Sequence, residues 1–280
     1  MNNVLFSTAV FAGSLLAGFL GSLTGLGGGV VIVPLLTTAF GVDIRYAIGA
    51  SLVSVIATSS GAASAYVREG FSNVRIGMLL EIATSAGALA GAALAAVVPT
   101  SGLAVLLGFV LLFSAFAPAH KGDQGTAPEV EDSDSLGARL QLNASYPGPG
   151  RAIRYSVRRL PLGFGLMGVA GVLSGLLGIG SGAIKVLAMD LAMGLPFKVS
   201  TTTSNFMIGV TAAASAGVYF HRGYIAPGLA MPVTLGVIAG SLAGARLLAA
   251  ARAGYLRTLF RAVIAVLGAE MIWSGWKGQI

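Results

Sequence analysis

The feature that most constrains this chain is a series of apolar stretches, each close to the length of a membrane-spanning helix. A helix of about 20 residues crosses the ~30 Å hydrocarbon layer of a bilayer. Eight stretches approach this length: 4–23, 46–67, 74–97, 102–117, 161–178, 199–220, 225–250 and 256–275. Two shorter ones, 30–40 and 183–193, each follow a glycine cluster. The pattern predicts an integral membrane protein.

Composition indicates the same class. Only 10% of the 280 residues are charged, whereas a soluble domain carries about 25% to cover its surface. The absence of cysteine excludes disulfides, thiol catalysis and cysteine-based metal sites. A net charge of +7 is typical of some nucleic-acid-binding proteins, but here Lys and Arg lie between the apolar stretches, where topology signals belong. We therefore expect the lipid bilayer as a partner, and no nucleic acid, metal or cofactor.

The two halves of the chain are related by a constant offset of 178 − 25 = 153 residues. The paired residues are Gly25 with Gly178, Gly41 with Gly194, Arg45 with Lys198, Ser51 with Ser204, Tyr66 with Tyr219 and Gly87 with Gly240. Chance similarity of two glycine-rich halves is the alternative. We predict two transmembrane repeats, 1–117 and 161–280, joined by a hydrophilic linker at 118–160. Within the linker, 121–150 is rich in Gly, Pro, Ser, Asp and Glu and is predicted to be flexible.

The distribution of Lys and Arg predicts the topology. If the short segments count as passes, each half has five, and 13 Lys and Arg residues share a side with the linker against 3 opposite, with Lys185 inside the membrane. Four passes per half give 10 against 6. The positive-inside rule favours five passes, which makes the repeats inverted. The predicted fold is an all-α polytopic helical bundle of two inverted repeats, with eight full-length spans and two short glycine-flanked segments. It lies in the cell (plasma) membrane, with external termini and a cytoplasmic linker.

Interrupted helices at matching places in two repeats are typical of a transporter's binding site. Their freed backbone N–H groups need partners in lipid, and an anion supplies them. The candidate substrate-binding residues here are Gly27, Gly28, Gly29, Gly180, Ser181 and Gly182. Tight helix packing is the alternative, and it explains the four-residue spacing of Gly87 and Gly91, and of Gly240 and Gly244.

Lys185 is the most informative side chain. It lies three residues after Gly182 in a short apolar segment, where its counterpart in the first half is Ile32. A charge at mid-membrane costs about 2.5–3.5 kcal/mol on insertion scales, so it usually faces a cavity or a partner. We predict that Lys185 faces an anionic substrate. Snorkelling, or a pair with Asp190 at the poor helical spacing of five residues, is the alternative.

Polar groups in the neighbouring spans complete the candidate site. Hydroxyl and carboxamide groups can donate hydrogen bonds to an anion, and they gather at the start of the span 199–220 and at its counterpart in the first half. The candidates are Ser51, Thr203, Ser204 and Asn205. Helix capping and hydrogen bonds between helices are the alternative.

Carboxylates inside apolar stretches are candidates for coupling transport to protons. Asp190 and Glu81 are the two candidates, with capping, pairing or an aqueous vestibule as alternatives. Glu270 also lies in an apolar stretch, and His120 and His221 lie at the ends of stretches. No nucleophile stands beside a base, so we do not expect an enzyme.

The motifs carry a resemblance to a known family. They are the segment 21–30 before Pro34, the segment 175–182, the run Thr-Thr-Thr-Ser-Asn ending at Asn205, and Tyr219 four residues before Gly223. The chain resembles the TauE/SafE family of sulfite and sulfonate exporters over its length outside 118–160. The resemblance implies a secondary transporter that exports small organosulfur anions, coupled to the proton gradient. It leaves open an uptake carrier for another small anion, an anion channel without proton coupling, a non-transporting scaffold, and a homodimeric assembly.

Overall fold

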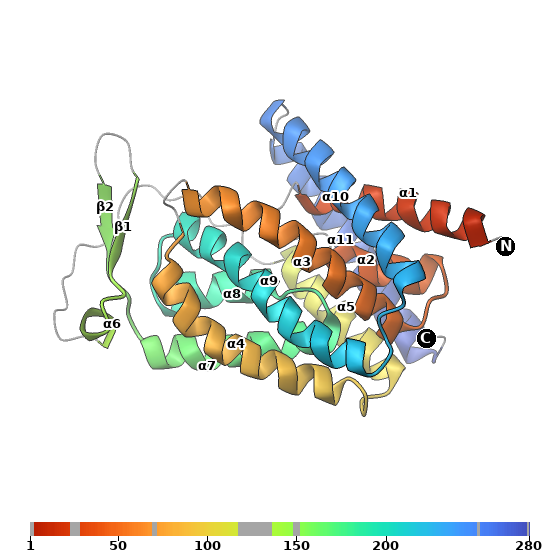
Figure 1. The fold of residues 1–280 in the computed structure, drawn as a ribbon, viewed down its shortest axis with the longest axis horizontal. Helices are drawn as coiled ribbons and strands as arrows, with labels where there is room; N and C mark the ends of the chain where they lie inside the picture. Colours follow the sequence, from red (N-terminus) through yellow and green to blue (C-terminus); the bar gives the residue numbers. More distant parts are fainter. Residues whose placement is uncertain are drawn as a thin grey trace.

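The computed structural model describes residues 3–22, 29–68, 72–116, 136–147, 152–250, 253–278 and 280. They form an elongated bundle of helices with a small β-hairpin at one end (Figure 1). The first half contributes α1 (Asn3–Ser22), α2 (Gly29–Pro34), the π-helix η1 (Leu35–Ala39), α3 (Ile44–Arg68), α4 (Val74–Leu94) and α5 (Thr100–Phe116). The second contributes α7 (Leu160–Leu177), α8 (Gly182–Leu187), the π-helix η2 (Ala188–Ala192), α9 (Phe197–His221), α10 (Pro227–Ala250) and α11 (Ala253–Trp276).

Local structure repeats along the chain at an offset of 153 residues. Adding 153 to the bounds of α2, η1 and α3 gives those of α8, η2 and α9, and the first residues of α4 and α5 map onto those of α10 and α11. Each π-helix is followed by a glycine with positive φ, 63° at Gly41 and 70° at Gly194, a conformation that glycine adopts without strain. The two halves therefore build the same succession of elements.

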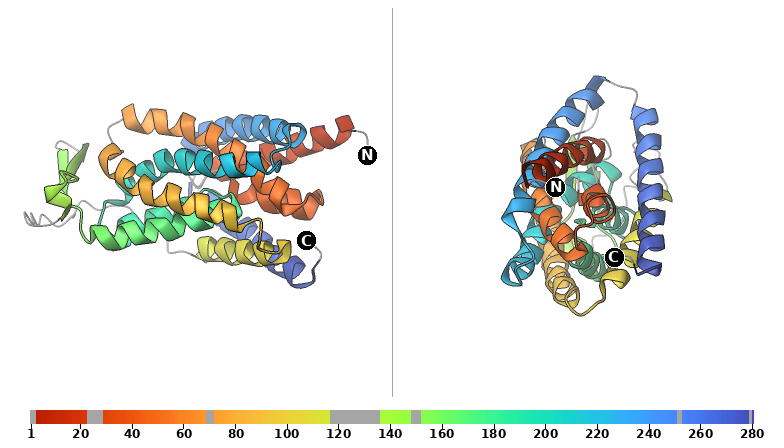
Figure 2. Two further views of the ribbon diagram at one scale, coloured as in Figure 1. Left: turned by 60° about the horizontal axis from the view of Figure 1, so that its bottom comes forward. Right: turned by 90° about the vertical axis from the view of Figure 1, so that its right-hand side faces the viewer.

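The short segments fold back along the helix before them. The Phe6 and Phe40 rings lie 6.0 Å apart, so the end of η1 lies beside the start of α1. In the second half, Arg158 N donates to Met193 O at 3.0 Å, which places the end of η2 beside the start of α7. The start of α1 lies at the end of the bundle that holds both termini, whereas α7 starts at the end that holds the hairpin (Figure 2).

Glycines allow two helix pairs, α1 with α10 and α4 with α7, to pack with their backbones in contact. A Cβ atom on Gly171 would overlap the backbone of Thr84, and one on Gly240 would overlap the carbonyl of Leu15. Gly87 faces Gly168 in the same way. The close-packing interpretation of Gly87 and Gly240 is confirmed.

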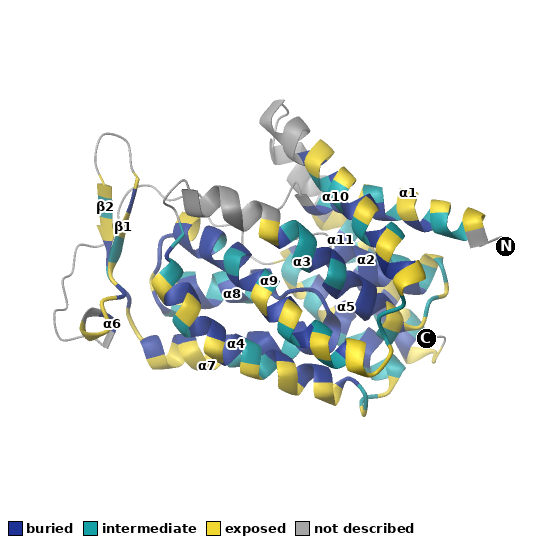
Figure 3. Cartoon of the chain, viewed as in Figure 1, coloured by how far each residue is buried: buried dark blue, intermediate teal, exposed yellow. Residues whose placement is uncertain are grey.

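Buried and exposed positions alternate along the helices of the bundle (Figure 3). Many large apolar side chains are exposed on its surface, as expected in lipid, and several polar side chains are buried in its interior. Large exposed side chains include Leu16, Met78, Ile82, Phe109, Phe113 and Trp273, whereas Ser51, Thr84, Lys185, Ser204 and Thr211 are buried. Four helices in the described part of the chain are long and apolar enough to cross a membrane: Val4–Gly21, Val74–Leu94, Leu160–Leu177 and Pro227–Gly244. Apart from the hairpin, the described residues are those of an all-α membrane protein.

The segment predicted to be a flexible linker is folded where the structure describes it. It contains α6 (Leu136–Arg139) and an antiparallel hairpin of β1 (Ala144–Pro147) and β2 (Ala152–Tyr155). Leu142, Tyr146 and Tyr155 are buried together with Ile76 and Met193 of the bundle. These few apolar side chains are enough to dock the hairpin, so the prediction of a flexible linker was wrong for this part. Residues 117–135 and 148–151 lie outside the described residues.

Candidate functional site

Gly29, the described residue of the first glycine cluster, lies close to Gly178 of the second cluster in the interior of the bundle. Ser51 of α3 donates its hydroxyl to Gly178 O at 2.8 Å and lies 3.4 Å from Gly29 O. In the second half, Ser204 of α9 donates to Gly182 O at 3.3 Å, which repeats the contact between Ser51 and Gly29 at the same offset. Each serine thus ties the first residue of a short helix to the long helix after it. The hydroxyls of Ser51 and Ser204 face backbone carbonyls of the clusters.

Left-handed backbone interrupts the second half between α7 and α8. Gly178 and Gly180 have φ values of 66° and 72°, and Ser181 has 48°, although its Cβ makes this conformation unfavourable. The Ser181 hydroxyl donates to Ala170 O of α7 at 2.7 Å, which helps to hold the turn. Beside Ser181 and Gly182 lies a cavity of about 10 Å³, also lined by Val30 of the first half. It has room for about one water molecule, so the residues that line it are closely packed.

Lys185 is fully buried in α8, and its ammonium group joins a chain of hydrogen bonds. Lys185 Nζ donates to Thr211 Oγ1 of α9 at 2.6 Å. Thr211 Oγ1 lies 2.7 Å from Glu81 Oε1 of α4, and Ser85 donates to the same carboxylate oxygen at 2.7 Å. Three helices from both halves thus bring together one cation and one carboxylate, with a hydroxyl between them. We call Glu81, Ser85, Lys185 and Thr211 the charged cluster.

The other predicted residues lie around these two features. Thr203 is buried and accepts a hydrogen bond from Asn73 N at 3.0 Å, so it holds the start of α4. Asn205 is buried six residues before Thr211 on α9. Asp190 is half-buried in η2, five residues after Lys185. Gly27 and Gly28 lie outside the described residues.

One placement differs from the sequence prediction. The run 201–205 was expected at the start of its span, but α9 begins at Phe197, after Pro196. Proline precedes the helix because it lacks an N–H group and fixes its own φ at −55° here. The hydroxyls of the run therefore lie in the second and third turns, and Thr202 uses its hydroxyl to bond Lys198 O within the helix.

Sequence reasoning missed Thr211 and Ser85. Ser85 follows Glu81 by four residues, a spacing that puts both side chains on one helix face, so it carried a usable signal. Thr211 is 130 residues from Glu81 and 26 from Lys185, and nothing in the sequence connects these three positions.

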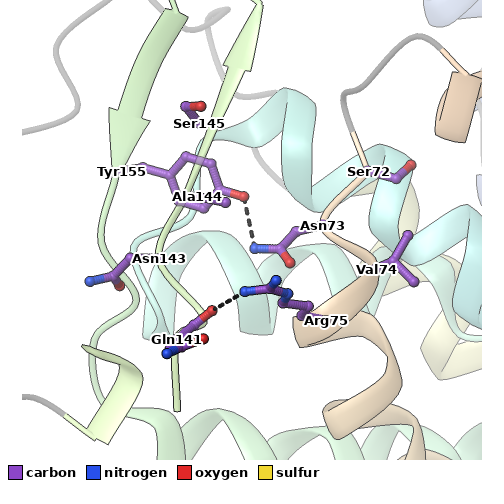
Figure 4. Close-up of a pocket in the computed structure, with 9 residues that line it drawn as sticks. All are labelled: Ser72, Asn73, Val74, Arg75, Gln141, Asn143, Ala144, Ser145 and Tyr155. Atoms are coloured by element: carbon purple, nitrogen blue, oxygen red, sulfur yellow. Dashed lines mark hydrogen bonds between the residues drawn. The ribbon is translucent and has the colours of Figure 1, made fainter. Parts of the chain in front are cut away.

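A second, wider pocket lies outside the bundle, between the start of α4 and the hairpin (Figure 4). It has a volume of about 230 Å³, and Arg75, Asn73 and Tyr155 are among its lining residues. Asn73 caps α4 by accepting from Ile76 N and donates to Tyr155 Oη at 2.9 Å. Burial raises the pKa of Tyr155 to about 12, although the hydrogen bond with Asn73 acts in the opposite direction. The pocket lies at the junction of the hairpin and the bundle, where the Asn73–Tyr155 hydrogen bond connects them.

Comparison with known proteins gives one consistent result. A family model described as "Sulfite exporter TauE/SafE" matches residues 10–271. The chain is similar to the "Probable membrane transporter protein YunE" of Bacillus subtilis (strain 168), 26% identical over 93% of this chain and 95% of the relative. It is also similar to "Probable membrane transporter protein YdhB" of the same organism, 26% identical over 87% and 89%, and to "Probable membrane transporter protein ORF9" of Sinorhizobium sp, 24% identical over 94% and 91%. No solved structure matches the chain at a significant level.

Proposed function

Because the chain belongs to the sulfite exporter TauE/SafE family, we propose that this membrane transporter exports small organosulfur anions, sulfonate-like or sulfite-like, in a process coupled to protons. The relatives are named as membrane transporters without a substrate, so the class of anion rests on the family description. An uptake carrier for another small anion and an anion channel are the alternatives.

The observation that carries the proposal is the buried ammonium of Lys185. It is fully enclosed within an apolar bundle, at the second turn of a helix that follows left-handed backbone. An ammonium group has three N–H donors, and among the described residues one of them has an acceptor, Thr211 Oγ1. A small anion satisfies such a group by charge as well as by hydrogen bonds.

The anion would lie between Lys185 and the glycine clusters. Its donors would be the ammonium of Lys185, the side chains of Ser51, Ser204 and Asn205, and the backbone N–H groups around Gly29 and Gly180–Gly182. Ser51 and Ser204 now bond cluster carbonyls and would exchange these acceptors for the anion. Thr203 supports α4 through Asn73 and would contribute indirectly. The strained φ of Ser181 fits a functional turn, since such strain gathers at ligand sites.

Transport would proceed by alternating access between two inverted repeats. Two observations support this architecture: the constant offset of 153 residues between the elements, and the opposite ends at which α1 and α7 start. The cavity of about 10 Å³ beside the clusters is too small for a sulfonate. Each half would therefore have to open in turn, as inverted repeats allow.

Proton coupling is assigned to Glu81 in preference to Asp190. Glu81 shares a hydrogen-bond partner, Thr211, with Lys185. Asp190 lies five residues from Lys185 along the segment α8–η2, a separation that does not place the two side chains on one helix face.

Ligand binding by the purified protein tests the proposal. Ethanesulfonate, sulfite, sulfate and acetate would be compared by thermal unfolding and calorimetry on wild type, Lys185→Met and Lys277→Met. We expect the sulfonate or sulfite to bind, and Lys185→Met to weaken binding about ten- to a hundredfold, the value of one or two charge-assisted hydrogen bonds. Lys277→Met removes an exposed lysine near the C-terminus and should bind like wild type.

Unchanged affinity in a well-folded Lys185→Met variant would remove Lys185 from the site. Lys185→Arg should restore binding in part, because it keeps the charge but not the shape of the ammonium. Proteoliposomes separate a transporter from a channel: a carrier should exchange internal for external labelled anion, whereas a channel should follow the membrane potential alone.

A further inference from the structure

The charged cluster leaves binding capacity on both of its charged groups. Glu81 Oε1 is bonded by two hydroxyls, but Glu81 Oε2 is buried and has no hydrogen-bond partner in the described part of the chain. The whole Glu81 side chain is 7% exposed. Oε2 is therefore a buried carboxylate oxygen without a hydrogen-bond donor. Lys185 is linked to Glu81 through the Thr211 hydroxyl, which bonds to Oε1 and not to Oε2.

Among the described residues, Lys185 is the charged group that is linked to Glu81, through the hydroxyl of Thr211. Glu81 lies on α4, which packs against α7 and α9, and α7 carries no titratable side chain. The remaining titratable groups lie more than one helical turn from Glu81, Thr211 or Lys185 along their own elements: Arg75 on α4, Lys198, Tyr219 and His221 on α9, and Asp190 on η2. Glu81 and Lys185 are the two charged side chains that are buried among the described residues, so the charge balance of this described interior depends on one ammonium and one carboxylate.

We infer that the anion and one proton bind together, with Glu81 as the proton site. A bound anion becomes the counter-charge of Lys185, which leaves the carboxylate of Glu81 unbalanced. Glu81 then takes one proton from water onto Oε2 and becomes a neutral carboxylic acid. When the anion leaves, the acid returns this proton to water and the ammonium regains its original counter-charge. This inference rests on the proposed function and adds the sign and number of its coupling.

The charges of the cycle balance at each step. The empty cluster has a net charge of zero, the anion alone would make it −1, and the anion with a proton restores zero. The transported pair is neutral, so the membrane potential exerts no force on it. Export then depends on accumulation of the anion inside the cell, and an inward proton gradient opposes it. An exchange of protons for anions would require the opposite linkage, release of a proton when the anion binds.

Calorimetry of ethanesulfonate binding in buffers of different ionisation enthalpy tests the sign. This probe stays anionic across the pH range of the experiment, so any proton taken up must bind to the protein. We expect wild type to take up about one proton per anion, and Glu81→Gln to bind the anion with none. Glu270→Gln is the matched control, because it neutralises an exposed carboxylate on another helix, α11, and should keep the uptake.

Binding without proton uptake, or with proton release, would overturn the inference while leaving the proposed function in place. Uptake that persists in Glu81→Gln would overturn the assignment to Glu81. Failure of the wild type to bind ethanesulfonate, sulfite, sulfate or acetate would instead overturn the proposed function. In that case the dependence of Glu81 protonation on the charge of Lys185 can still be tested by a measurement that uses no anion.

Infrared spectroscopy of the ligand-free protein provides this measurement. Lys185→Met removes the positive charge, as a bound anion would neutralise it, and should leave Glu81 protonated at neutral pH. A protonated-carboxyl band should appear in Lys185→Met, be absent from wild type, and disappear in the double variant Lys185→Met, Glu81→Gln. Lys185→Gln, which keeps a donor toward Thr211, is the second variant if Lys185→Met does not fold. An ionised Glu81 in these variants would overturn the inference.

Discussion

At the scale of single residues, the two charged side chains of the charged cluster have no charged equivalent at the matching positions of the other half. The counterpart of Lys185 is Ile32, which is fully buried, and the counterpart of Glu81 is Thr234. The Thr234 hydroxyl is buried without a hydrogen-bond partner among the described residues. Two halves with the same succession of elements therefore differ in the chemistry of their interiors.

Thr211 is the residue through which the two charges interact, and its hydroxyl can be removed with little change in shape. Thr211→Val should lower the free energy of unfolding by roughly 2 kcal/mol, the value of hydrogen bonds to charged groups. Thr211→Ser keeps the hydroxyl and should lose much less. Denaturation in detergent measures both. A Thr211→Val variant as stable as wild type would show that Lys185 and Glu81 do not need the bridge.

Tyr155 makes the docking of the hairpin sensitive to alkaline pH. Its pKa rises from 10.0 to about 12 on folding because burial disfavours the phenolate. The stability that this shift provides is complete below pH 10 and is lost as the pH rises from 10 to about 12. Tyr155→Phe lacks this component, so its thermal unfolding should depend less steeply on pH in this range. Equal pH dependence in both proteins would contradict the assignment to Tyr155.

At the scale of elements, the pairing of α4 with α7 depends on glycines at one face of α7. Gly171→Ala should destabilise the protein, because its Cβ overlaps the backbone of Thr84, which no side-chain rotation relieves. Gly165→Ala is the matched control on the same helix, since nothing lies within 4 Å of its Cβ. Alanine favours helices by about 1 kcal/mol over glycine, so Gly165→Ala should be neutral or slightly stabilising.

Thermal unfolding of both variants in detergent measures the difference. Equal melting temperatures for Gly171→Ala and Gly165→Ala would mean that α4 and α7 can separate without loss of stability.

The elements were largely predictable from the sequence, whereas the contacts between them were not. The length of the apolar stretches and the constant offset between glycines predicted the long helices and the two short segments, because these elements depend on residues close together in the sequence. The hairpin was missed because its few buried side chains, such as Leu142 and Tyr146, are diluted by Gly, Pro and charged residues. Lys185 was recognised as a buried charge, but its link to Glu81 arises only from the packing of α9 against both α8 and α4.

At the scale of the whole molecule, the termini and the hairpin mark opposite ends of the bundle (Figure 1). The hairpin end carries Arg75, Arg139, Arg154, Arg158, Arg159 and Lys198, and the other end carries Arg45, Arg222 and Lys277. By the positive-inside rule, the hairpin should be cytoplasmic and the termini external.

Cysteine labelling tests this orientation, since the natural chain has no cysteine. An impermeant maleimide added to intact cells should label Val4→Cys and Lys277→Cys, both exposed positions near the termini. Ser145→Cys, exposed on the hairpin, should be labelled only after the cells are permeabilised. Labelling of Ser145→Cys in intact cells would reverse the orientation.

The charged cluster also has a consequence for how the protein is made. Glu81 leaves the ribosome 185 − 81 = 104 residues before Lys185. At about 5–20 residues per second, α4 is synthesised roughly 5–20 s before the lysine that balances its acid. During this interval the nascent chain contains the carboxylate of the pair without its ammonium. Lys185, in the second half, is synthesised only after this interval. The acidic side chain of the pair is therefore made before its basic partner.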